Sequence, residues 1–144
     1  MAETTGYKGK GVTLGYAVGT ATSYTTIAQI RDVRGPNIDV TDINISNADS
    51  PGDWMEYLPG MKDGGEITFD VVYKPATGTT IHGLVAQTGN TWQVTLPDNG
   101  TATGSTIRCG GYLKSLGNDV PYNDAITNSA TIKVSGGVTF TAHA

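Results

Sequence analysis

The sequence contains one cysteine, Cys109, and only two histidines, His82 and His143. A single cysteine excludes an intrachain disulfide and any metal site built from several thiolates. Neither histidine belongs to an H-x-x-H or H-E-x-x-H motif, so the common zinc signatures are missing. Cys109 lies in an apolar stretch, which favours a buried and inert thiol. The histidines are more typical of surface or packing residues than of metal ligands.

Charge is also scarce in this chain. Only 15% of the residues are charged, the net charge is −4, and the nine lysines and arginines are scattered singly. Without a basic stripe the protein has little to neutralise phosphates, which argues against tight nucleic-acid binding. No apolar run reaches membrane-spanning length, and the first residues lack the basic and apolar regions of a secretory signal. We therefore expect a soluble protein made in the cytosol, without a membrane partner.

No set of residues indicates catalysis. Residues 9–15 resemble a phosphate-binding loop only superficially, because the G-x-x-x-x-G-K-[ST] order is absent. Residues 1–10 are better interpreted as a flexible N-terminal arm. Asp39, Asp42, Asp49 and Asp53 offer oxygen ligands for Ca²⁺, yet their spacing is not that of a 12-residue calcium loop, and a solvated acidic loop is favoured. A carboxylate pair for glycoside hydrolysis depends on spatial separation, which a sequence does not give. We expect no enzyme, no metal and no cofactor.

What the chain does have is glycine, 20 residues of it, and abundant threonine. This composition favours strands and turns over helices, and 144 residues suffice for a single domain, residues 1–144. Short strands punctuated by glycine, proline, asparagine and aspartate predict an all-β, mainly β protein with a sandwich or barrel-like fold. The strands are expected at residues 11–18, 24–33, from 38 onward, 66–74, 91–96, 105–116, 130–135 and 138–142. One short flanking helix is expected at residues 79–87, with a threonine as its N-cap.

Local patterns add detail to this expectation. Ile67, Phe69, Val71 and Tyr73 alternate with more polar residues, which predicts a strand with one core face. Trp92 alternates with apolar neighbours and is expected in the core. The apolar parity shifts after residues 38 and 40, which predicts a β-bulge or a change of face near residues 41–42. The glycine pair at residues 110–111 predicts a second bulge or a close backbone approach.

A long polar loop, residues 44–65, is the expected functional segment because it carries large apolar side chains. An interface is the favoured role for Trp54, through a protein contact or by stacking on a sugar; the alternative is that the loop folds back and covers it. The candidate interface residues are Asp53, Trp54, Met55, Tyr57, Leu58, Pro59 and Met61. The residues expected to shape or close turns are Gly35, Pro36, Gly60, Asp63, Gly64 and Glu66.

An ordered series of motifs in this chain resembles the major tail tube protein family of long-tailed phages. Residues 30–36 resemble the family's strand ending in Gly-Pro, and residues 38–42 its I-D-x-T strand. Residues 57–67 match its P-G-hydrophobic-x-D-x-G-E signature, with Met61 where leucine is commoner. Residues 82–84, 92–97, 111–116 and 130–136 resemble its helix and late strands, so the likeness covers roughly residues 10 to 140.

The resemblance implies a β-sandwich flanked by one helix, in a minimal form without the C-terminal immunoglobulin-like domain of some relatives. It implies a structural virion protein that forms six-membered rings stacked into a hollow tail tube, through which DNA passes during ejection. The long loop, residues 44–65, would contact adjacent subunits or rings. The implied partners are further copies of the chain and the tape measure, tail terminator and baseplate or tip proteins. The implied location is the virion tail, after assembly in the host cytoplasm.

Two alternatives remain open at the level of sequence. A tube protein of a contractile tail or a related injection machine would share the fold and the ring. A carbohydrate-binding sandwich or adhesin would use Trp54 and Tyr57 as a stacking platform and remain a monomer. Rings or filaments would separate the tube proteins from the adhesin.

Overall fold

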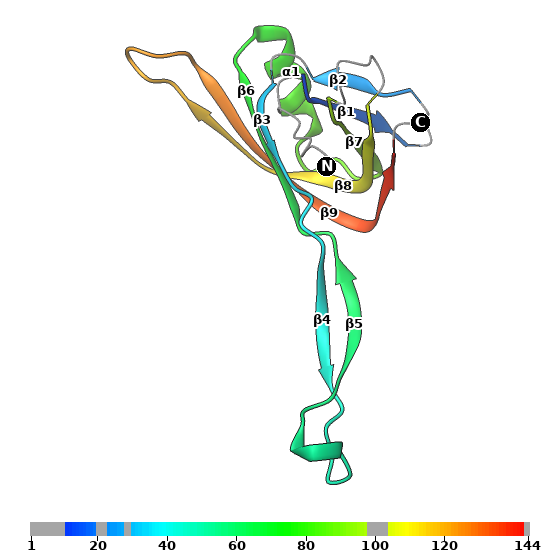
Figure 1. The fold of residues 1–144 in the computed structure, drawn as a ribbon. Coiled ribbons are helices and arrows are strands. Elements are labelled where there is room, and N and C mark those ends of the chain that lie inside the picture. The colour runs from blue at the N-terminus through cyan, green and yellow to red at the C-terminus, as the bar shows by residue number, and fades with distance from the viewer. Residues whose placement is uncertain (1–10, 20–22, 28–29, 98–103, 143–144) are drawn as a thin grey trace, which may run out of the picture.

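The chain folds mainly into antiparallel strands. The structure is a computed structural model that describes residues 11–19, 23–27, 30–97 and 104–142. Figure 1 shows the elements in their order. They are β1 (Thr13–Val18), β2 (Thr25–Ile27), β3 (Ile30–Arg34), β4 (Asp39–Asn44), the 3-10 helix η1 (Pro51–Asp53), β5 (Tyr57–Asp63), β6 (Glu66–Val72), α1 (Pro75–Leu84), β7 (Asn90–Thr95), β8 (Thr106–Asp119) and β9 (Thr127–Thr141).

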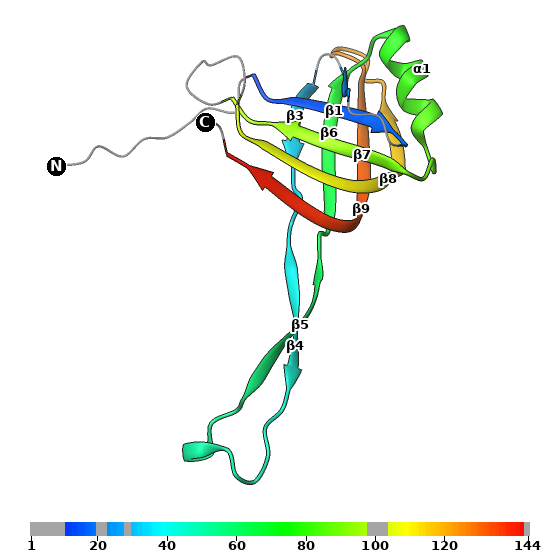
Figure 2. The ribbon, with the colours of Figure 1, turned by 90° about the vertical axis from the view of Figure 1, so that its right-hand side faces the viewer.

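Seven strands form one antiparallel sheet in the order β2-β1-β7-β8-β9-β6-β3. The two long strands β8 and β9 bend sharply and belong to both halves of this sheet (Figures 1 and 2). Strand β7 pairs with the first half of β8, and β6 pairs with the first half of β9. The sheet thereby folds over itself, and its two halves become the layers of a sandwich. The mainly β fold with one short helix is confirmed.

The core lies between the two layers. Strand β6 alternates strictly, with Ile67, Phe69 and Val71 buried and the residues between them only partly covered. Trp92 is fully buried, as predicted, and its indole Nε1 donates a hydrogen bond of 3.2 Å to the carbonyl oxygen of Gly111. Cys109 is also buried, as predicted. The prediction for Tyr73 was wrong: it follows the end of β6 and is about half exposed.

Helix α1 starts one turn earlier than predicted. Lys74 is its N-cap and Pro75 its first helical residue, so the expected threonine cap at residue 79 was wrong. Proline suits the first helical position because its fixed φ matches the helix and its missing N–H would have no partner there. Ile81 and Leu84 face the core, while His82 is exposed, as expected of a surface residue. No helix in the described part of the chain is long and apolar enough to cross a membrane.

Several strand boundaries differ from the predictions. The segment 24–33 contains two separate strands, β2 and β3, and residues 127–141 form one strand where two were expected. Glycine at positions 136 and 137 lets β9 bend without breaking. Both predicted bulges are confirmed by register shifts, one between Val40 and Asp42 and one between Cys109 and Gly111. His143 and the expected N-terminal arm, residues 1–10, lie outside the described residues.

Strands β4 and β5 pair only with each other and form a hairpin that projects far from the sandwich (Figures 1 and 2). We call residues 38–63 the arm. The prediction of a loop over residues 44–65 was wrong for its second half, because residues 57–63 form β5. Pro59 interrupts the pattern expected of a strand, yet it is tolerated here because β5 has a neighbour on one side only.

The two tryptophans provide a matched test of this fold. Trp92→Ala removes a fully buried ring and its hydrogen bond, so it should lower the free energy of unfolding by about 3–5 kcal/mol. Trp54→Ala changes a side chain that is 78% exposed and should leave that free energy within about 0.5 kcal/mol of wild type. Urea unfolding of the unassembled protein measures both. Equal losses for the two variants would contradict the assigned core.

Candidate assembly surfaces

The arm is a two-stranded ribbon with no core of its own. Asp39 lies opposite Asp63 at its base, and Asn44 lies opposite Tyr57 near its tip. Both faces of each strand are exposed, and only Gly60 is partly covered. An isolated hairpin of this kind is at best marginally stable in water. The arm therefore has the character of a segment that is completed by a partner.

Large apolar side chains gather on this arm. Trp54 is 78% exposed and Met61 is 86% exposed, so the alternative in which the loop covers Trp54 was wrong. The other exposed apolar residues of the arm are Ile38, Val40, Ile43, Ile45, Met55, Tyr57 and Leu58. An exposed set of this size makes the arm a candidate interaction surface. All seven residues of the predicted interface, from Asp53 to Met61, lie on it.

The tip of the arm has a hydrogen-bonded conformation of its own. The Ser50 hydroxyl donates to the Glu56 carboxylate at 2.8 Å, and the Glu56 amide donates to the Ser46 hydroxyl at 2.7 Å. Asp53 takes a left-handed conformation with φ 61°, which few residues other than glycine adopt. These contacts hold Trp54 away from the ribbon, where it faces solvent.

The junction between arm and sandwich depends on glycine. Gly35 has φ 98°, and a side chain there would collide with the backbone oxygen of Glu66. Gly64 packs so closely on Val134 that a Cβ would overlap its side chain. The carbonyl oxygen of Gly65 accepts a hydrogen bond of 3.0 Å from the Val134 amide. The Gly35 contact fixes the segment after β3 against β6, and the Gly64 and Gly65 contacts fix the segment before β6 on β9.

The predicted turn residues divide between two places. Gly35, Pro36 and Gly64 lie at the junction, and Asp63 closes it by accepting a hydrogen bond of 2.9 Å from the Gly65 amide. Gly60 instead lies within β5, where a side chain would come too close to the carbonyl oxygen of Thr41 on the neighbouring strand. The prediction that Gly60 shapes a turn was wrong, because it lies in β5 opposite the bulge in β4.

Two ion pairs stand beside the junction. The Lys114 ammonium lies 2.7 Å from a Glu66 carboxylate oxygen, and the Lys133 ammonium lies 3.5 Å from Asp63. The hydrogen bond from Lys114, and then its charge, lower the pKa of Glu66. The hydrogen bond from the Gly65 amide, and then the charge of Lys133, lower the pKa of Asp63. Both carboxylates remain exposed, so solvent screens these interactions.

The layer formed by β3, β6, the first half of β9 and the second half of β8 has an open edge on each side within the described residues. In the other layer, β2 and the second half of β9 are also edges. Strand β3 pairs with β6 on one side only. Strand β8 loses β7 after Gly111, and the Ala86 amide covers only the carbonyl oxygen of Leu113. Residues 114–119 of β8 therefore pair with β9 alone. Both edges bound the same layer of the sandwich, in the order β3-β6-β9-β8.

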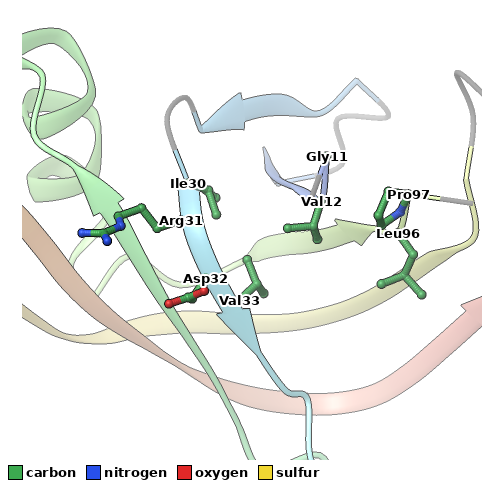
Figure 3. A pocket seen from close by; sticks show the side chains of 8 residues that line it. All are labelled: Gly11, Val12, Ile30, Arg31, Asp32, Val33, Leu96 and Pro97. Carbon is green, nitrogen blue, oxygen red and sulfur yellow. The ribbon is translucent and has the colours of Figure 1, made fainter. Parts of the chain in front are cut away.

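A groove of about 530 Å³ runs along β3, between this strand and the start of β1 and the end of β7 (Figure 3). Val12, Ile30, Val33 and Leu96 give it an aliphatic lining. Arg31 and Asp32 extend on the side of β3 away from Val12 (Figure 3), as expected from the register shift between Ile30 and Asp32. The groove is thus mainly apolar, and Asp32 is the only carboxylate in its lining, with no histidine, cysteine or serine beside it.

The described residues offer little for other chemistry. They contain no cluster of three histidine, cysteine, aspartate or glutamate side chains that could hold a metal ion. Burial raises the pKa of the Cys109 thiol to about 11, which makes the thiolate rare at neutral pH.

One exposed feature was missed from the sequence. The second half of β8 and the first half of β9 form a second projecting hairpin (Figure 1). Its turn carries Val120 and Tyr122, and Tyr122 is 99% exposed. In the sequence, this hairpin was indicated only by Val120 and Tyr122, which flank Pro121 in an Asn- and Asp-rich turn. Such a pair is too short to be distinguished from an ordinary turn.

Comparisons with known proteins extend these observations. The family described as "Lambda phage tail tube protein, TTP" matches residues 7–141. Among curated protein sequences none matches significantly. A chain of the virion of a native gene transfer agent particle is similar in structure, with 20% identity, a TM-score of 0.74, and coverage of 95% of this chain and 100% of that chain. A chain of the tail of an empty gene transfer agent particle with C6 symmetry has 21% identity, a TM-score of 0.72 and the same coverage.

The SPP1 tail tube is also similar, with 10% identity, a TM-score of 0.65, and coverage of 92% of this chain and 77% of that chain. A chain from the baseplate of the anti-feeding prophage has 10% identity and a TM-score of 0.72, with 98% of each chain covered. At these identities the likeness shows a shared fold.

The junction ion pairs can be tested by titration. A carboxyl group whose pKa is lower in the folded than in the unfolded state stabilises the fold at pH values above its unfolded pKa. This contribution is lost as the pH falls through its folded pKa. Lys114→Met should raise the pKa of Glu66 toward its ordinary value and leave that of Asp63 low, because Gly65 still donates to Asp63. Carboxyl carbon NMR of the unassembled protein measures both. An unchanged Glu66 pKa would contradict the pairing.

Proposed function

Because this chain belongs to the lambda phage tail tube protein family, we propose that it assembles as six-membered rings that stack into a hollow tube. The protein is a structural, non-enzymatic component of the virion tail and forms the tail tube. The observation that carries the proposal is the pair of unpaired edges on the layer β3-β6-β9-β8. The C6 symmetry of the gene transfer agent tail supports six as the number of subunits.

Ring closure would satisfy both edges at once. The β3 edge of one subunit would pair with residues 114–119 of β8 in the next subunit. The four-stranded layers would then join into one closed barrel, and closure removes the edges that otherwise promote uncontrolled aggregation. Such a contact is heterologous, because two different surfaces meet, and heterologous contacts generate rings when the rotation closes.

The outer face of this layer would line the tube. Thr68 and Thr131 are register partners on it, and Asp70 lies opposite both Asp32 and Ser129. Two cations, Arg34 opposite Thr68 and Lys133 opposite Glu66, also lie on this face, and Lys133 is paired with Asp63. Hydroxyl groups attract phosphates weakly, and paired carboxylates repel them. A face of this composition suits transient, sequence-independent passage of DNA, which has to slide without being held. We propose that the phage genome passes over it during ejection.

Stacking of the rings would use the arm. The arm projects beyond the end of the sandwich (Figure 2), so it can reach a subunit of an adjacent ring. Repeated head-to-tail stacking has no built-in end. The length of the tube must therefore be set by other proteins. We propose the tape measure, the tail terminator and the baseplate or tip proteins of the same phage as partners, with assembly in the host cytoplasm.

The family match favours a tube of the lambda type over the two alternatives. A contractile-tail or injection-machine tube shares the fold, as the likeness to the anti-feeding prophage chain indicates. A carbohydrate-binding module would have to use Trp54 without rings, and it would leave both sheet edges unpaired.

Electron microscopy of the concentrated protein tests the proposed function. We expect hollow tubes with six-fold end views from the wild type. Trp54→Ala together with Leu58→Ala should leave a folded, soluble protein that forms no tubes, because two apolar contacts of the arm are lost. Circular dichroism checks the fold. A wild type that remains monomeric under every condition would contradict the proposal, and normal tubes from the double variant would exclude the arm from assembly.

A further inference from the structure

The two ends of the subunit differ in charge. Six carboxylates and one lysine lie on the arm, so it carries a charge of −5, whereas the whole chain carries −4. The rest of the chain therefore has a charge of +1. An acidic arm is repelled by an acidic surface and attracted to a basic one. The arm is thus suited to a particular part of another copy of this chain.

The end of the sandwich opposite the arm is that part. Strand β6 leaves the arm junction at Glu66 and ends at Val72, which lies beside Thr127 of β9. Helix α1 begins immediately afterwards, and the Tyr73 amide donates to the carbonyl oxygen of Ile126. Arm and α1 therefore lie at opposite ends of the same strand (Figure 1). In a head-to-tail stack, the arm of one subunit faces the α1 end of another.

The α1 end contains a groove of about 220 Å³ between β2 and the first turns of α1. Thr25, Ile27, Ala76 and Thr80 line it, and Lys74 is the one charged residue in its lining. Its volume corresponds to that of one large side chain. The carboxylates of this end, Asp119 and Asp124, belong to the β8–β9 hairpin and are not part of the groove lining.

The start of α1 also lacks its usual negative partner. Lys74 is the N-cap, it makes no side-chain capping hydrogen bond, and the first turn contains no acidic residue. The first amides of a ten-residue helix carry a partial positive charge, which a carboxylate stabilises. Among the described residues Lys74 makes no ion pair. The groove is thus bordered by two positive features without a partner.

The tip of the arm carries the complementary groups. Trp54 is exposed, and its neighbour Asp53 is held in a left-handed conformation, of the kind that clusters at functional sites. Glu56 is already engaged with Ser50, whereas Asp53 makes no ion pair within the described residues. The Trp54 ring beside the Asp53 carboxylate matches a groove lined by four threonines, Ile27 and Ala76 beside the Lys74 ammonium group.

We propose that the arm tip of one copy docks in the groove between β2 and α1 of a copy in the adjacent ring. Trp54 fills the groove, and the Asp53 carboxylate meets Lys74 and the first amides of α1. The assignment rests on the proposed function, since it presumes stacked rings. The proposed docking names the surface that receives the arm tip, and it identifies the contact that gives the stack its direction.

A charge swap tests this contact. Lys74→Glu and Asp53→Lys, each alone, should reduce tube mass at least about tenfold in sedimentation and microscopy, because like charges then face each other. Lys74→Glu combined with Asp53→Lys should restore tubes. The matched control is Lys74→Glu combined with Asp39→Lys, which has the same net charge but changes the base of the arm; it should not restore them.

The outcomes separate this assignment from the proposed function. Normal tubes from Lys74→Glu, equal restoration by Asp39→Lys, or no restoration by Asp53→Lys in folded protein would each overturn the docking site. Thermal unfolding of every variant checks the fold. Failure of the wild type to form rings or tubes would instead overturn the proposed function itself.

Discussion

Strand β3 and the second half of β8 each have a strand neighbour on one side only, and the rest of the structure is organised around this constraint. Backbone groups on an open edge need a partner, which is water in the single subunit and another strand in a closed ring. The bends in β8 and β9 bring both edges into one layer. The same bends place the other layer and α1 on the far side, where they complete the core.

The arm and the α1 end lie at opposite ends of the subunit, and they constrain how subunits can meet along that axis. The glycine contacts at positions 35, 64 and 65 fix the junction on β6 and β9, so the direction of the arm is set by the sandwich. A ribbon without a core is stabilised mainly by what it binds. The ring closure and the stacking proposed above would therefore use different surfaces of the subunit, and each would leave the other available.

Much of this arrangement could be predicted from the sequence, for identifiable reasons. The alternation around Phe69 and the apolar setting of Trp92 fix their burial, because a strand with one core face leaves this pattern. The parity shift after Val40 predicted the bulge in β4. The exposed Trp54 was recognised because it stands among polar residues without periodicity.

Other features left no such pattern. Strand β5 contains Pro59 and Gly60 and is exposed on both faces, so it lacks alternation and resembles a loop. The start of α1 at Pro75 depends on where β6 ends, and Tyr73 is exposed for the same reason. The groove beside Lys74 joins residues from β2 and α1, which are about 50 positions apart in the chain. Only the fold brings such residues together.

The central claim is that unpaired edges of the single subunit become paired in the tube. Amide hydrogen exchange, followed by mass spectrometry on the unassembled and the assembled protein, tests it most directly. We predict that the amides of β3 and of residues 114–119 that point away from their strand partners exchange quickly before assembly and become strongly protected in tubes, while those of β6 are protected in both states. Equally fast exchange at both edges before and after assembly would contradict it.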